Sequence, residues 1–362
     1  MIGKRGVFMR QMTALIKPAS SLCNLRCSYC FYCDEADSRK KRTAEKMEIS
    51  TAENLIKKMF DFCGENSLLT FMFQGGEPLL AGIDFFKEFI ETAEKHRTQG
   101  SIIQYSLQTN GTLIDEEFCK LFKENNFLIG VSIDGDKEIH DKNRCKSFDK
   151  AMQGIGLLKK HGVEFNILSV ITAKTDASML FDFYIRNDFR SVQPIYCLDS
   201  LGGEKGDYSL SAKQLARFKK RFFNLWFAEV SKGKHFYVRD FDNLLSLLTK
   251  GIAEQCGASG RCNAQLVVEA DGTCYPCDFY CLDEFECANI NETDINGILN
   301  SEGLKKFFLH DEEKNPLCQS CPVKSVCGGG CKRYRSLYNQ LSGYCPQMDF
   351  ILHALNKLRS VK

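Results

Sequence analysis

The first two thirds of the chain alternate short apolar runs with longer amphipathic ones, a pattern that predicts repeated strand–helix units. Several of the apolar runs are hydrophobic on both faces, as expected for parallel strands covered by helices. The predicted strands are Thr13–Ala19, Leu68–Gln74, Ser101–Thr109, Phe127–Asp134, Glu164–Thr172 and Ser191–Leu198. The predicted helices between them are Ser50–Cys63, Ile83–His96, Asp115–Glu124, Phe148–His161 and Ala177–Asn187.

Six such units in series predict a parallel α/β domain, either an open sheet or a partial barrel. Three polar motifs fall where a predicted strand ends: "QGGEP" (Gln74–Pro78), "QTNG" (Gln108–Gly111) and "SIDG" (Ser132–Gly135). A cysteine-rich stretch, Cys23–Cys30, likewise follows the first strand. Because α/β enzymes place their chemistry at the carboxyl ends of the strands, we expect one functional edge.

The character of the chain changes after about Lys250. A long helical stretch with the only tryptophan, Trp226, gives way to a segment rich in cysteine, glycine and turn residues, with one short strand expected at Ala264–Gly272. This segment has too little apolar material for a core of its own, so we expect its folding to depend on metal. The expected domains are residues 13–235, a cysteine-rich extension at 236–350, and a helical tail at 351–362.

Charge and composition exclude some classes of function. The 362 residues carry a formal net charge of +2, which gives no electrostatic argument for nucleic acid or for an anionic membrane. No apolar run is long enough for a signal peptide or a membrane span. We therefore expect a cytoplasmic protein, and in a reducing compartment nineteen cysteines indicate metal ligation or catalysis rather than disulfides.

The densest cysteine motif is CxxxCxxC, formed by Cys23, Cys27 and Cys30. With Cys33 as a fourth ligand it suits a closed zinc site. Without a fourth ligand it suits a 4Fe-4S cluster that leaves one iron open to a small molecule.

With Tyr29 before its last cysteine, this motif resembles the radical S-adenosylmethionine (radical SAM) superfamily, whose clusters bind that cofactor and use it to abstract hydrogen atoms. The resemblance implies that the Gly75, Gly76 and Glu77 backbone holds the methionine amino group, where a glycine pair permits close approach to the ligand. It places contacts to the methionine carboxylate and the ribose at Ser132, Asp134 and Arg144, and an adenine contact at Leu198.

The C-terminal cysteines resemble the SPASM extension of that superfamily, which holds two auxiliary 4Fe-4S clusters. The resemblance assigns Cys256, Cys262, Cys277 and Cys331 to the first cluster and Cys318, Cys321, Cys327 and Cys345 to the second. Two zinc ribbons made from the same thiolates are the alternative. Three cysteines of this region are left over, Cys274, Cys281 and Cys287. Outside it, Cys33, Cys63, Cys119, Cys145 and Cys197 are expected to be small apolar residues rather than ligands.

Stretches such as "FQGGEPLLAG", "SIDGDKEIHDKNR" and "YPCDFY" resemble the anaerobic sulfatase-maturating enzymes. That family combines a partial (β/α)6 barrel with the two-cluster extension. It oxidises a cysteine, and in some members a serine, of a sulfatase precursor to Cα-formylglycine. The resemblance implies that Asp278 accepts a proton and that Gln74 contacts the substrate. It also implies an unfolded peptide of CxPxR or SxPxR type as partner, with ferredoxin or flavodoxin as electron donor.

Two other functions compete with this one. A radical SAM maturase that forms thioether or carbon–carbon crosslinks in a ribosomal peptide needs the same clusters. An electron carrier or zinc-stabilised scaffold is the alternative outside the enzymes, although it leaves the open-iron spacing and the "GGEP" loop unexplained.

Overall fold

The fold is built around one ten-stranded sheet with the strand order β10-β9-β8-β1-β2-β3-β4-β5-β6-β7. The computed structural model describes residues 9–40, 45–201 and 205–360. The strands are β1 Arg10–Ile16, β2 Ser67–Phe73, β3 Ile102–Thr109, β4 Leu128–Ser132, β5 Phe165–Ile171, β6 Ser191–Tyr196, β7 Tyr237–Val238, β8 Leu266–Val268, β9 Thr273–Tyr275 and β10 Ala288–Asn289. From β8 through β1 to β7 neighbouring strands are parallel, and β9 and β10 add antiparallel pairs.

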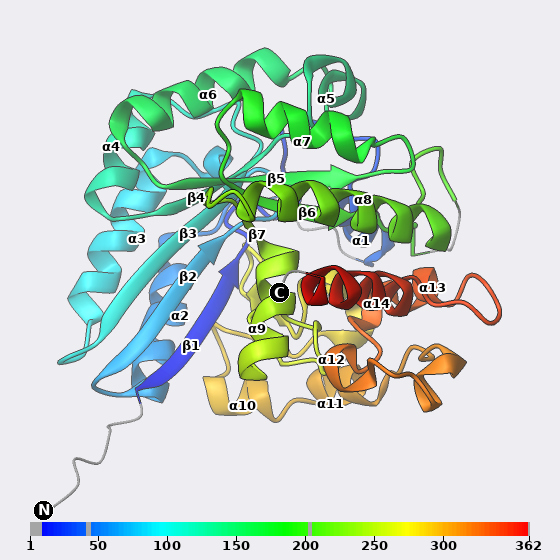
Figure 1. The fold of residues 1–362 in the computed structure, drawn as a ribbon. Coiled ribbons are helices and arrows are strands. Elements are labelled where there is room, and N and C mark those ends of the chain that lie inside the picture. The colour runs from blue at the N-terminus through cyan, green and yellow to red at the C-terminus, as the bar shows by residue number, and fades with distance from the viewer. Residues whose placement is uncertain (1–8, 41–44, 202–204, 361–362) are drawn as a thin grey trace, which may run out of the picture.

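Helices cover the outer side of the curved parallel sheet, and the C-terminal segment, yellow to red, packs beside α8 and α9 (Figure 1). The α-helices are α1 Phe31–Ser38, α2 Ile49–Cys63, α3 Ile83–His96, α4 Glu116–Glu124, α5 Lys137–Asn143, α6 Phe148–His161, α7 Ala177–Arg186, α8 Ala212–Val230, α9 Arg239–Lys250, α10 Ile295–Leu299, α11 Glu302–Leu309, α12 Lys324–Cys327, α13 Arg335–Tyr338 and α14 Pro346–Arg359. Five short 3-10 helices are η1 Pro78–Ala81, η2 Asp278–Tyr280, η3 Asp283–Phe285, η4 Pro316–Gln319 and η5 Lys332–Tyr334.

Local sequence accounts for most element boundaries. Asp115 and Asp176 accept backbone hydrogen bonds at the starts of α4 and α7, and Ser211 forms a capping box with Gln214 at the start of α8. Gly162 ends α6 in a left-handed conformation. These short-range signals lie within the sequence itself, which is why the helices begin and end close to where it predicts.

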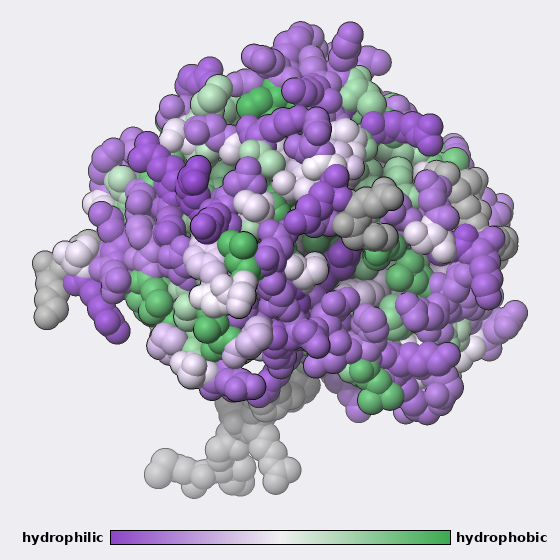
Figure 2. Space-filling model, turned by 90° about the vertical axis from the view of Figure 1, so that its right-hand side faces the viewer, coloured by the Kyte–Doolittle hydropathy of each residue, from purple (hydrophilic) through white to green (hydrophobic). Residues whose placement is uncertain are grey.

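The main core lies between the sheet and its helices and is rich in phenylalanine. Phe71 and Phe73 of β2 pack edge-on against Phe89 of α3 at ring distances of 5.1 and 5.0 Å. Aromatic pairs of this kind add about 0.5–1.5 kcal/mol beyond the burial of their surface. Hydrophilic side chains cover most of the face in Figure 2, and hydrophobic ones appear there in small separate groups.

The structure confirms the six predicted strands and five predicted helices of the α/β part, and the partial barrel with a cysteine-rich extension. The expected strand at Ala264–Gly272 is β8, which pairs with β1 and so joins the extension to the same sheet. Within the expected tail, α14 ends at Arg359, while residues 361–362 lie outside the described part. No helix among the described residues is long and apolar enough to span a membrane.

Candidate active site

The three-cysteine loop runs from the end of β1 to the start of α1, where Cys30 is the residue before the helix. A turn after α5 holds it in place. Ser28 N donates to Asn143 O at 3.0 Å, and the Cys145 thiol donates to Arg26 O at 3.0 Å while accepting from Arg26 N at 3.3 Å. The loop is therefore fixed by backbone contacts at its centre, with its three thiols half-buried.

The thiols of this loop lie close enough to influence one another. Burial raises the pKa of Cys27 to about 12, an effect that Arg144 opposes and that Cys30 and Cys23 reinforce. Hydrogen bonds from Cys33 and from the Tyr32 backbone lower the pKa of Cys30 to about 6 against its burial. The loop thus gathers the motif's thiols at the carboxyl end of the first strand.

Beside them lies a buried ion pair. Tyr29 Oη donates to Asp134 Oδ2, and the same oxygen lies 3.1 Å from Arg144 Nε. Val170 N donates to Asp134 Oδ1 at 3.0 Å. Both oxygens of Asp134 therefore have partners within the protein, and the carboxylate positions Arg144, whose Nη1 donates to Cys27 Sγ at 3.9 Å.

The glycine pair of "GGEP" packs against the three-cysteine loop. Gly76 N donates to Ser20 O at 2.8 Å, and a Cβ at Gly76 would lie 2.1 Å from Leu22 O. A Cβ at Gly75, where φ is +118°, would meet Ser20 O at 3.1 Å. The space that a Cβ would fill is taken by backbone of the chain itself, so the two glycines allow this loop to pack against the three-cysteine loop.

Glu77 is completely buried. Its carboxylate accepts from Thr109 Oγ1 and Asn110 N, both at 2.8 Å, and from Leu79 N at 3.1 Å. Burial raises its pKa to about 7 despite these bonds. The Glu77 side chain links the "GGEP" loop to the "QTNG" loop. Because its carboxylate is engaged in this way, the backbone of Glu77 is the part that would contact a ligand.

Three further candidates lie at the same edge of the sheet. Ser132 is the last residue of β4, Gln74 follows β2, and Leu198 lies two residues beyond β6. Parallel pairing brings these strand ends together. Every candidate named in the α/β part therefore shares the carboxyl edge of the parallel strands with the three-cysteine loop.

Asp278, at the start of η2, is held by a lysine from the far end of the sequence. Lys17, which is fully buried, places Nζ 3.1 Å from Asp278 Oδ1 and 3.6 Å from Glu269 Oε1. The same ammonium lies 3.7 Å from the centre of the Tyr32 ring. Burial alone would lower the pKa of Lys17, but Cys281, Tyr32, Asp278 and Glu269, in that order of effect, raise that pKa well above its usual value, so Lys17 stays charged.

This buried group includes residues that the sequence did not single out. Glu269 also pairs with Arg39 at 3.1 Å and accepts from Tyr32 Oη at 2.7 Å. Burial raises the pKa of nearby Glu35, a residue that is 1% exposed. The only sign of this group in the sequence is that Lys17 is a charged residue directly after an apolar strand. No local pattern links Lys17 to its partners, which lie about 250 residues later in the sequence.

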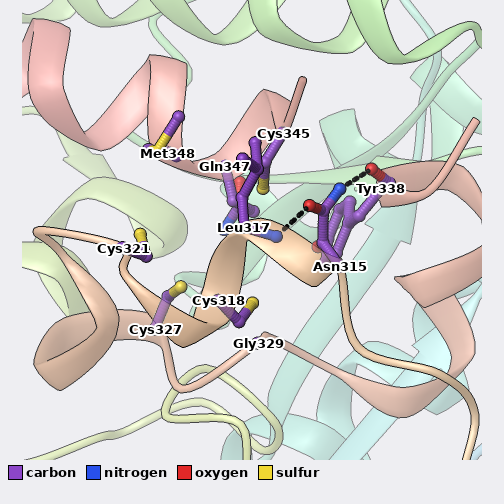
Figure 3. A pocket seen from close by; sticks show the side chains of 10 residues that line it. All are labelled: Asn315, Leu317, Cys318, Cys321, Cys327, Gly329, Tyr338, Cys345, Gln347 and Met348. Atoms are coloured by element: carbon purple, nitrogen blue, oxygen red, sulfur yellow. Dashed lines mark hydrogen bonds between the residues drawn. The ribbon is translucent and has the colours of Figure 1, made fainter. Parts of the chain in front are cut away.

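In the extension, four of the predicted ligands line one pocket: Cys318, Cys321, Cys327 and Cys345. They come from η4, the loop after it, the end of α12 and the residue before α14, and Figure 3 shows their thiols around the same hollow. Asn315 supports this wall, since it donates to Tyr338 O at 2.8 Å and accepts from Leu317 N at 3.0 Å. These are the four residues assigned to the second auxiliary cluster.

The other four predicted ligands also converge. Cys256 and Cys262 lie near Cys331 and raise its pKa, which burial shifts to about 11, and Cys331 in turn raises the pKa of Cys277. A Cβ at Gly257 would lie 2.8 Å from Cys331 Cβ. The loop that carries Cys256 therefore packs directly on the turn that carries Cys331.

The donor sets can be compared with the metals expected from the sequence. All nineteen cysteines lie in the described residues, and none of them forms a disulfide bond there. A 4Fe-4S cluster binds each of its cysteines at a different iron. The three loop thiols therefore suit a cluster with one open iron, and each four-cysteine set suits a fully ligated cluster.

Comparisons with known proteins agree with this geometry. The model of the radical SAM superfamily matches residues 18–180, and that of an iron–sulfur cluster-binding domain, SPASM, matches residues 256–322. The chain is 41% identical over 90% of its length, and 89% of the relative, to a cysteine-type anaerobic sulfatase-maturating enzyme of Clostridium novyi. It is 33% identical over 91% of its length, and 84% of the relative, to a serine-type enzyme of Bacteroides thetaiotaomicron.

Among solved structures, native anSMEcpe with bound AdoMet matches with a TM-score of 0.89 and 38% identity, covering 97% of this chain and 99% of that one. The same protein with bound AdoMet and the Kp18Cys peptide matches with a TM-score of 0.88. SuiB, which has been solved with its precursor peptide SuiA, is 18% identical with a TM-score of 0.63, and this likeness concerns the fold alone. The chain belongs to the anaerobic sulfatase-maturating enzymes of the radical SAM superfamily.

Proposed function

We propose that this enzyme oxidises a cysteine of an unfolded sulfatase segment of CxPxR type to Cα-formylglycine, with Asp278 as the proton acceptor. The cysteine-type relative is more similar to the chain than the serine-type one, which favours a cysteine substrate. The observation that carries the proposal is the placement of Asp278 next to Cys277, with its carboxylate held by the buried Lys17.

The chain's residues divide the work. Cys23, Cys27 and Cys30 would hold the 4Fe-4S cluster that binds S-adenosylmethionine. The cluster and the cofactor together would supply the radical chemistry that takes a hydrogen atom from the substrate Cβ. Arg144 is held by its ion pair with Asp134, and its positive charge would bind the methionine carboxylate. Tyr29 would keep Asp134 in place. Ser132 and Leu198 would contact the ribose and the adenine.

Asp278 would remove the proton that leaves the substrate thiol. Its Oδ1 is buried against Lys17, and the side chain as a whole is 16% exposed, which leaves Oδ2 to accept the proton. Gln74, directly after β2 on the same edge, would orient the peptide backbone. The two four-cysteine sets would hold fully ligated clusters that carry electrons and leave substrate binding to the edge of the sheet.

We further propose a reduced ferredoxin or flavodoxin as electron donor and a reducing, cytoplasmic setting. The support is the number and grouping of the thiolates, which such a setting preserves.

The test is Asp278→Asn, which keeps the shape of the side chain. With S-adenosylmethionine, dithionite and a CxPxR peptide under anaerobic conditions, the variant should still form 5′-deoxyadenosine while aldehyde formation falls by about a hundredfold or more. Glu284→Gln, on the exposed part of η3, is the matched control. Aldehyde formation at the unchanged rate in Asp278→Asn would refute the role of Asp278.

A further inference from the structure

A second hollow lies between α8 and the start of α14, outside the site described above. Its lining includes Lys213, Arg217, Lys220 and Arg221 of α8, together with Tyr344 and Asp349. We call it the basic groove. The four basic residues stand at i, i+4, i+7 and i+8 of one helix, so they share one face.

The charge of the basic groove is concentrated and accessible. Lys213, Arg217 and Arg221 are exposed. The one acidic side chain in the lining, Asp349, pairs with Lys220 at 2.9 Å. The side chains that line the groove therefore carry a net charge of about +3, whereas the formal net charge of the whole chain is only +2. Such a local field attracts and orients an acidic partner.

The basic groove shares a wall with the four-thiol pocket. Tyr344 and Asp349 line the groove, whereas Cys345, Gln347 and Met348 line the pocket. The wall is formed by residues 344–349, which include the first turn of α14, and Cys345 is the residue before that helix. Lys219, buried in α8, donates to Gln347 Oε1 at 2.9 Å and fixes the two helices together. A molecule in the groove is thus separated from one of the four thiols, that of Cys345, by this wall alone.

We propose that the basic groove docks a small acidic one-electron carrier protein of the flavodoxin or ferredoxin class. This inference rests on the proposed function, because the chain needs an electron source. The four thiolates of the adjoining pocket would hold a 4Fe-4S cluster, and that cluster would accept the one electron that the carrier loses, with no bond formed or broken. Nucleic acid would also respond to positive charge, but the shared wall with the thiols gives a reason only for an electron carrier.

The experiment measures binding of a flavodoxin, and separately of a ferredoxin, to the reconstituted enzyme. The variant is the triple charge reversal Lys213→Glu, Arg217→Glu and Arg221→Glu. The control is another triple reversal, Lys57→Glu, Lys120→Glu and Lys150→Glu, on the exposed faces of α2, α4 and α6. Both variants change the net charge by the same amount, so only position distinguishes them.

At low ionic strength the groove variant should bind its carrier about tenfold or more weakly than the control variant, with the difference shrinking as salt is added. In the groove variant, turnover driven by the carrier should fall by about the same factor as binding of the carrier. Turnover driven by dithionite should be unchanged. Equal carrier affinity in the two variants would overturn the docking proposal. So would a selective loss of binding to a DNA or RNA oligonucleotide. If dithionite fails to drive aldehyde formation in the unmodified enzyme, the proposed function is at fault instead.

Discussion

Replacement of Lys17 by methionine tests the buried charge group around Asp278. The side chain keeps its length but loses the ammonium that lies 3.1 Å from Asp278 Oδ1 and 3.6 Å from Glu269 Oε1. Removing one partner of a buried ion pair costs about 3–5 kcal/mol, because the other charge is left uncompensated. Glu269 keeps Arg39, and Asp278 is 16% exposed, so we expect the lower end, about 3 kcal/mol.

The double variant Lys17→Met with Asp278→Asn separates this cost from packing. Once Asp278 carries no charge, the missing ammonium matters less, and part of the stability should return. The free energy of unfolding, measured by denaturant titration under anaerobic conditions, should give a coupling of about 1–3 kcal/mol between the two positions.

Activity should respond in a specific way. Lys17→Met should still cleave S-adenosylmethionine, because Lys17 contacts none of the three loop cysteines, but it should form the aldehyde about a hundredfold more slowly. A coupling below about 0.5 kcal/mol, with aldehyde formation intact, would refute the claim that Lys17 holds Asp278.

Three further predictions concern other parts of the site. Gly76→Ala should displace the Leu22 backbone and lower the iron content by about four per chain, whereas Gly156→Ala, whose Cβ meets nothing within 4 Å, should not. Cys345→Ala should also lose about four irons yet keep cleavage of S-adenosylmethionine, as 5′-deoxyadenosine assays would show. Burial lowers the pKa of His140 to about 4, so the unfolded chain takes up a proton near pH 6.5 that the folded one refuses. The free energy of unfolding should therefore fall by up to about 3 kcal/mol from pH 6.5 to pH 4, and His140→Gln should remove that part of the decrease in a pH series of denaturant titrations.

The sequence predicts the parallel part of the fold well because its signals are local. The two-sided apolar runs and the capping residues such as Asp115 and Ser211 specify each strand and helix within a few neighbours. The position of β8 beside β1 is not local. That pairing joins Ile16 to Val268, about 250 residues apart, so no periodicity in either stretch reveals it.

The functional site likewise combines features that the sequence predicts with features that depend on tertiary contacts. Motif spacing identifies the three-cysteine loop and Asp278 through the family resemblance, and the structure brings them to one side of the molecule with the extension. The surroundings of Asp278 depend on tertiary contacts between Lys17, Tyr32 and Glu269, none of which is marked by spacing. The contact of Gly76 with the Leu22 backbone is not predictable from sequence either, because a glycine pair indicates close approach without saying what approaches.

The most direct test of the central claim is one anaerobic reaction followed by mass spectrometry. The reconstituted enzyme is given S-adenosylmethionine, dithionite and a peptide with a CxPxR motif, and its iron is counted. The account predicts about twelve irons per chain, formation of 5′-deoxyadenosine, and a peptide whose thiol sulfur has been replaced by an aldehyde oxygen. Formation of 5′-deoxyadenosine with an unchanged peptide would contradict the proposed substrate, and zinc in place of iron would contradict the account of the three-cysteine loop itself.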